Sequence, residues 1–489
     1  MTDDTPQPEP EPAVSSARHG TAVPRGQDPL AGDRGGRFGR MFPFLAPCAP
    51  SDGAIDELVA GMKARPEPNM RIPSGYTYLG QFVDHDITFD PQSSLERVND
   101  PHALVNFRTP RFDLDSLYGS GPADQPFLYD WGSPSDPGVK LLVGHNPPGD
   151  DLAPTDLPRN EQGRALIGDA RNDENLIVAQ LHLLFIRFHN KVVERVRAQH
   201  RAMAGGAVFT EAQRIVRWHY QWIVVHDFLA RIVGKVAYDK LRPRADGTAP
   251  RAERWLSAWR DAPVMPVEFS AAAYRFGHSM VRGGYRARRP DDAFPIFRRD
   301  GDDGPHFAGF RRLPAQLAIE WDLFFFESDP DRRANHSLRI DTSLAAPLFF
   351  LPPDGAQLAR LNLRRGRALG LPSGPDVARA MSIEPLARAE VGQLTHIPQA
   401  TVAQLQAMLD ALPLWVYVLL EARVRGNDGL NLGPVGGQIV AEVLVGLLEA
   451  DPSSYLRRRP AWTPELSDRD DRDFAMPDLL RYLEDPDRL

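Results

Sequence analysis

The chain has 489 residues, of which 42% are hydrophobic and 25% charged, an ordinary balance for a globular protein. Its formal net charge of -8 argues against a nucleic-acid-binding protein, because neutralising phosphates requires a basic face. A single cysteine, Cys48, excludes an intramolecular disulfide framework and a metal site built on paired cysteines.

The first 40 residues are rich in Pro, Glu, Gly and Arg and poor in large apolar side chains. Such a segment buries too little surface to offset the entropy of ordering, which predicts a disordered tail over 1–40 and a folded body over 41–489. Because no apolar signal-peptide core is visible, a cytoplasmic location is the default expectation, with leaderless secretion as the alternative. No apolar run approaches the roughly 20 residues that cross a bilayer, so we expect no transmembrane segment.

Helical patterns dominate the rest of the chain. Apolar residues at helical spacing predict helices over 176–196, 211–233, 402–412, 414–423 and 436–449. Segments rich in Pro, Gly and Asp, notably 88–165 and 284–314, predict long loops between them. The sequence therefore predicts a mainly α fold: one large helical body with long loops and very little β structure.

The segment GQFVDHD, from Gly80 to Asp86, holds candidate active-site residues. On a helix that turns about 100° per residue, Asp84 and His85 flank Gln81 on one face, while Asp86 points away. An imidazole beside a glutamine suits peroxide cleavage, in which a base takes a proton from one oxygen and returns it to the other. Two alternatives remain on these residues alone: a helix-surface histidine, or a hydrolytic metal site of Asp84, His85 and Asp86.

The GQFVDHD segment resembles the distal motif of animal-type haem peroxidases, in the peroxidase-cyclooxygenase superfamily. Five further segments follow that family's motifs: TPRFDLDSLYG at 109–119, RNDE at 171–174, YRFGH at 274–278, LNLRR at 361–365 and GPVGG at 433–437. The chain is thus identified as a bacterial-type member of this family. The resemblance implies a haem b cofactor and hydrogen peroxide as the oxidising substrate.

The resemblance implies three catalytic residues. His85 would shuttle the proton, and the guanidinium of Arg171 would stabilise the charge that develops as the O–O bond breaks. Gln81 would hold the distal water or a halide. A salt bridge of Arg171 with Glu174 and Asp173 is the structural alternative.

The resemblance also implies residues that bind the haem covalently. Asp84 and Glu174 correspond to the carboxylates that form ester links to two haem methyls. The family's third link, from a methionine that follows the glutamate, cannot form here because Asn175 stands in its place.

On the other side of the haem, the resemblance implies His278 as the proximal iron ligand. Asn362 would accept the second N–H of that imidazole and so set its orientation. Arg275 and Arg365 correspond to partners of the haem propionates.

A calcium site is implied by the TPRFDLDSLYG segment. In an extended stretch Thr109, Arg111, Asp113 and Asp115 would face one way, and Asp86 would join them from the outward side of its helix. Oxygen ligands of this kind suit Ca²⁺, with Arg111 contributing only its backbone carbonyl. A solvated acidic turn is the alternative.

The predicted function is that of a haem peroxidase that reduces hydrogen peroxide. Through a ferryl intermediate it would oxidise halide, thiocyanate or small phenolic donors. The alternatives are a haem-dependent fatty-acid dioxygenase and a haem-binding structural or adhesion protein with vestigial activity. The dioxygenases carry a radical-forming tyrosine three residues before the proximal histidine, where this chain has Arg275, with Tyr274 one position earlier.

The remaining aromatic residues of the long helices are interpreted as core. Trp218 and Trp222 read as packing residues. Two pairs of histidines spaced seven apart are assigned no chemistry: His182 with His189, and His219 with His226.

Overall fold

The computed structural model describes residues 38–88, 110–148, 151–242, 264–298, 304–325, 334–352, 355–458 and 460–486. Thr109 and most of the predicted tail lie outside these ranges. The last three tail residues do not: β1 (Phe38–Gly39) pairs in parallel with β5 (Met265–Pro266), and Arg40 donates to the Gly370 carbonyl oxygen at 2.9 Å. The predicted boundary at residue 41 is therefore at least three residues late.

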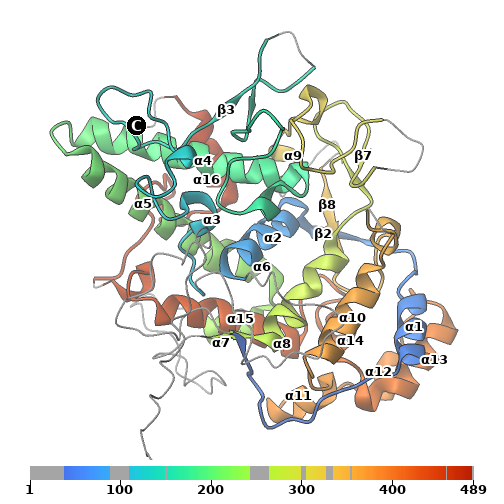
Figure 1. Ribbon diagram of the computed structural model, residues 1–489. Coiled ribbons are helices and arrows are strands. Elements are labelled where there is room, and N and C mark those ends of the chain that lie inside the picture. Colours follow the sequence, from blue (N-terminus) through green and yellow to red (C-terminus); the bar gives the residue numbers. More distant parts are fainter. Residues whose placement is uncertain are drawn as a thin grey trace, which may run out of the picture.

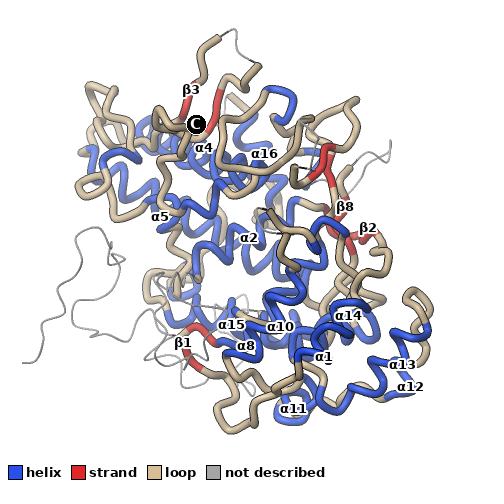
Figure 2. The backbone as a smooth tube through the Cα atoms, turned by 45° about the vertical axis from the view of Figure 1, so that its right-hand side comes forward, coloured by secondary structure: helices blue, strands red, loops and turns tan. Residues whose placement is uncertain are grey.

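Helices are the dominant regular structure of the described residues, as predicted (Figure 2). The longer α-helices are α1 (Asp52–Gly61), α2 (Gly75–Ile87), α4 (Leu176–Gln199), α5 (Gly205–Trp222), α10 (Leu358–Ala368), α13 (Gln399–Met408), α14 (Leu414–Arg425), α15 (Pro434–Ala450) and α16 (Met476–Glu484). The shorter ones are α3 (Asp115–Tyr118), α6 (Ala230–Ile232), α7 (Lys235–Leu241), α8 (Val267–Ser270), α9 (Asp322–Phe325), α11 (Gly374–Ala380) and α12 (Arg388–Val391). Short 3₁₀ helices are η2 (Pro126–Leu128), η3 (Ala170–Asp173), η6 (Ala273–Met280), η7 (Ala315–Leu317), η8 (Ala346–Phe349), η9 (Leu409–Ala411) and η10 (Tyr455–Arg457).

Strands in the described residues form only two-stranded pairs. Besides β1 and β5, three antiparallel pairs occur: β2 (Pro68–Pro73) with β8 (His336–Leu338), β3 (Gly144–His145) with β4 (Thr155–Asp156), and β6 (Gly284–Tyr285) with β7 (Phe294–Pro295). The prediction of very little β structure is confirmed.

The helix predicted over 211–233 is continuous but not uniform. Between α5 and α6 the chain forms a π-helix, η4 (Ile223–Leu229). The buried Asp227 within it accepts hydrogen bonds from the Tyr76 hydroxyl at 2.8 Å, the Arg231 Nε at 2.7 Å and the Met476 backbone N–H at 2.9 Å. A wider turn of this kind is a common feature near functional sites.

Helix α2 lies at the middle of the molecule and positions the candidate site (Figure 1). Gly75 at its start permits close packing, since a Cβ there would lie 2.5 Å from the Phe324 carbonyl oxygen. Farther along, Phe82 stacks on Phe185 of α4 with ring centroids 5.0 Å apart. These contacts bury one side of α2 and leave the other side to face η3 and η6.

Helix α4 begins at a strong cap, because the Asn175 side chain accepts from the backbone N–H groups of Ile177 at 3.1 Å and Val178 at 2.9 Å. Within the described ranges, α4 alone has the length and apolar content of a helix that could cross a membrane. Most of it is buried inside the protein.

Candidate active site

Gln81 and His85, one turn apart on α2, both approach Glu174. The Gln81 side-chain amide donates to Glu174 Oε1, and His85 Nε2 lies 3.9 Å from the same oxygen. Asn175 Nδ2 donates to Gln81 Oε1 at 3.1 Å. The residue that stands where the family has methionine thus caps α4 and also holds Gln81.

His85 is held in one tautomer by residues that sequence reasoning did not select. Its Nδ1 lies 2.7 Å from the side-chain oxygen of Asn172, which can only accept, so Nδ1 carries the hydrogen and Nε2 keeps a lone pair. The Asn172 amide nitrogen lies 2.9 Å from His182 Nδ1. Burial lowers the pKa of His182 to about 3, so its ring is neutral at physiological pH. His182 Nδ1 can therefore accept the hydrogen bond from the Asn172 amide.

The sequence indicates no chemical role for His182. In the structure it fixes the orientation of the Asn172 amide, and that amide fixes the tautomer of His85. In the sequence, His182 is a histidine on the apolar face of the helix that follows the RNDE segment. This pattern fits a packed core residue equally well.

Arg171 lies beside the distal residues but is already engaged. Its guanidinium pairs with Asp169 at 2.8 Å and donates to the backbone oxygens of His85 at 3.0 Å and Thr88 at 2.6 Å, near the C-terminal end of α2. The alternative interpretation, a salt bridge of Arg171 with Glu174 and Asp173, is wrong because Arg171 forms its ion pair with Asp169. The charge of Arg171 nevertheless lowers the pKa of both Asp84 and Glu174 against the larger effect of burial.

The proximal residues come from η6 and α10. The Asn362 amide nitrogen lies 2.9 Å from His278 Nδ1, while its oxygen accepts from Arg275 Nη1 at 2.8 Å. The pairing of Asn362 with His278 is as predicted, but the predicted polarity is wrong, because the oxygen expected to accept from His278 is turned to Arg275. If a metal binds at His278 Nε2, Nδ1 must carry the hydrogen. The Asn362 side-chain amide must then rotate so that its oxygen faces Nδ1 and accepts that hydrogen.

Arg275 and Arg365 lie close enough for their charges to repel. Burial, and then the charge of Arg365, lower the pKa of Arg275. The carboxylate of Asp84 opposes this effect and raises the pKa of Arg275. Guanidiniums whose charges repel are stabilised by an anion near both. The two arginines therefore fit the carboxylates of haem propionates.

Several of these side chains keep accessible surface although protein surrounds them. Glu174 exposes 41% of its side chain, yet burial raises its pKa to about 7. His278 is only half-buried, yet burial and then Arg275 lower its pKa to about 3. A Cβ added to Gly277 would meet no atom within 4 Å. Accessible surface on side chains that protein surrounds indicates open space among α2, η6 and the start of α4, and we refer to this space as the hollow.

Asp86 lies on the opposite side of α2, fully buried. Its carboxylate gathers with those of Asp113 and Asp115, all with ligand atoms within 4.8 Å of one another. The predicted extended stretch is wrong: Leu114 has a left-handed φ of 57°, and Asp115 opens helix α3. A bend, rather than strand alternation, brings Asp113 and Asp115 together, and the placement of Thr109 is not described.

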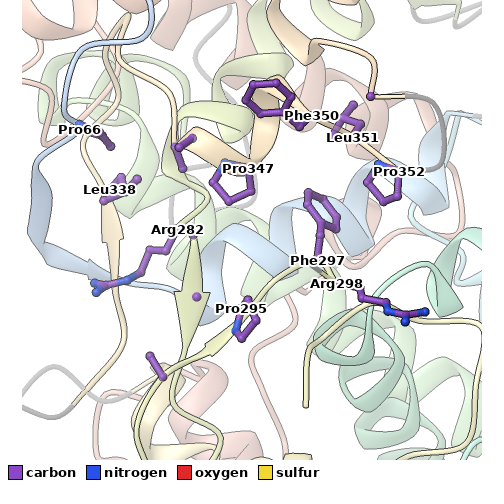
Figure 3. Close-up of a pocket in the computed structure, with 16 residues that line it drawn as sticks. Pro66, Arg282, Pro295, Phe297, Arg298, Leu338, Pro347, Phe350, Leu351 and Pro352 are labelled. Atoms are coloured by element: carbon purple, nitrogen blue, oxygen red, sulfur yellow. The ribbon is translucent and has the colours of Figure 1, made fainter. Parts of the chain in front are cut away.

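A separate cavity of about 910 Å³ opens beyond the end of η6 (Figure 3). Its lining is mainly apolar, with Pro295, Phe297, Pro347 and Phe350 around the space. Arg282 at its edge donates to the His336 carbonyl oxygen at 2.9 Å. None of the distal or proximal residues lines this cavity, so it is distinct from the hollow.

A model of the animal haem peroxidase family matches residues 95–455 of this chain, which is most of its length. The chain belongs to the animal haem peroxidase family. Membership implies that it binds haem, in agreement with the hollow and the residues around it.

Curated relatives carry peroxidase names. Thyroid peroxidase of Sus scrofa is 26% identical over 301 residues, which cover 56% of this chain and 30% of that protein. Chorion peroxidase of Drosophila melanogaster is 28% identical, over 61% of this chain and 36% of that protein. The chain therefore spans about a third of the length of the curated relatives it matches.

Solved structures share the fold. Peroxidase A from Dictyostelium discoideum superposes with a TM-score of 0.63 at 17% identity, over 86% of this chain and 88% of that one. The fatty acid alpha-dioxygenase of Oryza sativa reaches a TM-score of 0.61 at 15% identity, over 86% and 76%. At these identities the likeness shows the fold and does not choose between the two activities.

Proposed function

We propose that this chain is a haem-dependent peroxidase that reduces hydrogen peroxide and oxidises a halide, thiocyanate or a small phenolic donor. The observation that carries the proposal is the fixed tautomer of His85. With the hydrogen on Nδ1 bonded to Asn172, the lone pair is on Nε2, which lies 3.9 Å from Glu174 Oε1 at the hollow. A base in this position can take a proton from peroxide and return it to the departing oxygen.

Haem, when bound, supplies an iron centre that exchanges electrons with peroxide and with the donor. His278 would ligate it, with Asn362 fixing the ring, and Arg275 and Arg365 would pair with its propionates. Asp84 and Glu174 would form ester links. Burial raises the pKa of both carboxyl groups, which favours the neutral state that an ester also has.

Around the reacting peroxide, each distal residue has a separate task. His85 moves the proton, Gln81 holds a water or halide through its amide, and the charge of Arg171 favours negative charge on the departing oxygen. Because Arg171 is anchored by Asp169, it acts from a fixed position and needs no rearrangement.

We also propose that Asp86, Asp113 and Asp115 hold Ca²⁺, with Thr109 and the Arg111 carbonyl as further ligands. Three carboxylates that approach within 4.8 Å and are all buried call for a cation between them. Oxygen-only ligands select a hard cation such as Ca²⁺.

The fatty-acid dioxygenase alternative is less well supported. The position three residues before His278 is Arg275, whose guanidinium donates to Asn362 and to the Ser270 carbonyl oxygen at 3.1 Å. The nearby Tyr274 donates its hydroxyl to the Gly80 carbonyl oxygen at 3.1 Å. Oxygen uptake on addition of linoleate, without peroxide, would favour this alternative.

The deciding experiment is an absorption spectrum of haem-replete protein before and after hydrogen peroxide, followed by acid-acetone extraction. We expect a Soret band that shifts within the mixing time, and haem that stays with the protein if the ester links form. The variant His85→Ala should keep the Soret band and slow the shift by about 10²–10⁴. An unchanged rate in this variant would remove His85 from the mechanism.

A further inference from the structure

A cluster of oxidisable side chains lies along the helical run of α5 and η4, away from the hollow. We name it the His226 cluster: Trp222, His226, Tyr238, Tyr455 and Trp462. Ring centroids are 4.0 Å apart for Trp222 and His226, 5.5 Å for Trp222 and Tyr455, and 5.8 Å for Tyr455 and Trp462. Four of the five are only half-buried, with Tyr455 beneath them.

His226 lies within hydrogen-bonding distance of two tyrosine hydroxyls of the cluster. His226 Nε2 lies 2.9 Å from the Tyr455 hydroxyl, and Nδ1 lies 3.2 Å from the Tyr238 hydroxyl. Burial lowers the pKa of His226 to about 4, so the ring is neutral and has one accepting nitrogen. One tyrosine therefore donates its O–H to His226, and the shorter distance favours Tyr455.

The indole of Trp222 also has a proton acceptor, because its Nε1 donates a hydrogen bond to the carboxylate of Asp473 at 2.8 Å. Trp218, one turn earlier on α5, differs. Its Nε1 donates to the Ser453 carbonyl oxygen at 2.9 Å, and an amide oxygen does not take up a proton at neutral pH.

Helix η4 leads from the cluster toward the hollow. Phe228 follows His226 by two residues on η4, and its ring centroid lies 6.4 Å from that of Tyr274. Tyr274 belongs to the same 3₁₀ helix as His278. Its hydroxyl donates to the Gly80 carbonyl oxygen, next to Gln81.

We propose that the His226 cluster is a second donor site, at which electrons from phenols or aromatic amines enter the protein and pass to the haem centre. The inference rests on the proposed function, which supplies the oxidant: reduction of one hydrogen peroxide to two waters consumes two electrons and two protons. Tyr455 loses an electron and passes its O–H proton to His226. A phenol beside the half-buried Trp222 then supplies the electron that restores Tyr455, His226 returns the proton to the Tyr455 oxygen, and the phenol releases its own proton to solvent and leaves as a phenoxyl radical. Two phenols thus supply the two electrons and two protons that one peroxide consumes.

The test uses haem-replete protein mixed with hydrogen peroxide in the presence of the radical trap 2-methyl-2-nitrosopropane. The Soret shift reports the proposed function, and peptide mass spectrometry locates the trapped radical. We expect adducts on Tyr455 or Trp222. A Soret shift with adducts only elsewhere, or with none, overturns this inference and leaves the peroxidase proposal intact. Absence of the Soret shift overturns both.

Matched variants separate electron transfer from packing. Tyr455→Phe keeps the ring and removes the O–H, so it should lose the adduct at that peptide and turnover of the bulky aromatic donor ABTS, while iodide oxidation is retained. Trp218→Phe is the control, since Trp218 packs on Trp462 with centroids 5.4 Å apart but lacks a proton acceptor. Equal loss of ABTS turnover in both variants would mean that the cluster serves packing, and would overturn the inference.

Discussion

The side-chain oxygen of Asn172 lies 2.7 Å from Nδ1 of His85, and this one hydrogen bond determines which imidazole nitrogen can act as a base. The Asn172 amide is itself oriented by His182, whose Nδ1 lies 2.9 Å from the amide nitrogen. Orientation of the base thus passes through two residues that do not touch the peroxide.

We predict that Asn172→Leu slows the reaction with peroxide by about 10², the lower end of what a positioned acid-base group contributes. Without the acceptor, either nitrogen of His85 can carry the hydrogen. Stopped-flow measurement of the Soret shift gives the rate.

Asn172→Asp is the matched control, because a carboxylate still accepts from Nδ1. It should retain most of the rate and raise the pKa of His85, which moves the acid limb of the pH–rate profile to higher pH. A Leu variant as fast as the parent would contradict the orienting role.

The proximal amide leads to a second prediction. In Asn362→Asp a carboxylate accepts the Nδ1 hydrogen of His278 and makes the imidazole a stronger donor to iron. We expect the ferric–ferrous midpoint potential to fall by roughly 60 mV, which corresponds to a tenfold change in a one-electron equilibrium. Spectroelectrochemical titration measures it. The exposed Gln393→Glu adds the same charge at a distance and should leave the potential unchanged.

Glu421 predicts a pH dependence of stability. Its buried carboxylate accepts from the Val435 N–H at 2.9 Å and the Gly436 N–H at 3.3 Å at the start of α15, and burial raises its pKa from 4.5 to about 7. Below pH 4.5 the group is protonated in both states. Above pH 4.5 the glutamate ionises in the unfolded chain but stays protonated in the folded protein. The free energy of unfolding therefore falls by about 3 kcal/mol as the pH rises from 4.5 to 7.

Glu421→Gln should remove this loss while still accepting the two N–H groups, and urea unfolding of haem-free protein between pH 4.5 and 8 measures the difference. Glu390→Gln is the contrasting variant. Glu390 pairs with Arg425 at 2.7 Å, and that hydrogen bond lowers its pKa, so its removal should leave the parent's decline between pH 5 and 7 in place. The same slope in the Glu421 variant as in the parent would count against this assignment.

The proposed calcium site predicts an effect of chelation. Removal of the ion with EGTA leaves three buried carboxylates to repel one another, so the Tm should fall by several degrees. Asp115→Asn should lower the affinity for Ca²⁺ and reduce the EGTA effect. Readdition of Ca²⁺ should restore the Tm where Mg²⁺ does not, because Mg²⁺ demands a smaller octahedral shell. A Tm insensitive to EGTA would remove the site.

The sequence by itself determined those features that depend on local periodicity and on the order of motifs. Helical spacing placed Gln81, Asp84 and His85 on one face of α2 and Asp86 on another, and apolar runs located α4 and α15 within a few residues. These succeed because 3.6-residue periodicity fixes which side chains share a face, whatever packs against it.

Only the tertiary structure decided which polar groups pair. Arg171 pairs with Asp169 rather than Glu174, the Asn362 oxygen faces Arg275, and His226 meets Tyr455, which lies 229 positions farther along the chain. A hydrogen bond depends on positions to within a few tenths of an ångström, and these are set by how distant helices pack. The local pattern that marks a histidine as buried therefore could not distinguish His182, which orients the base, from one that only fills space.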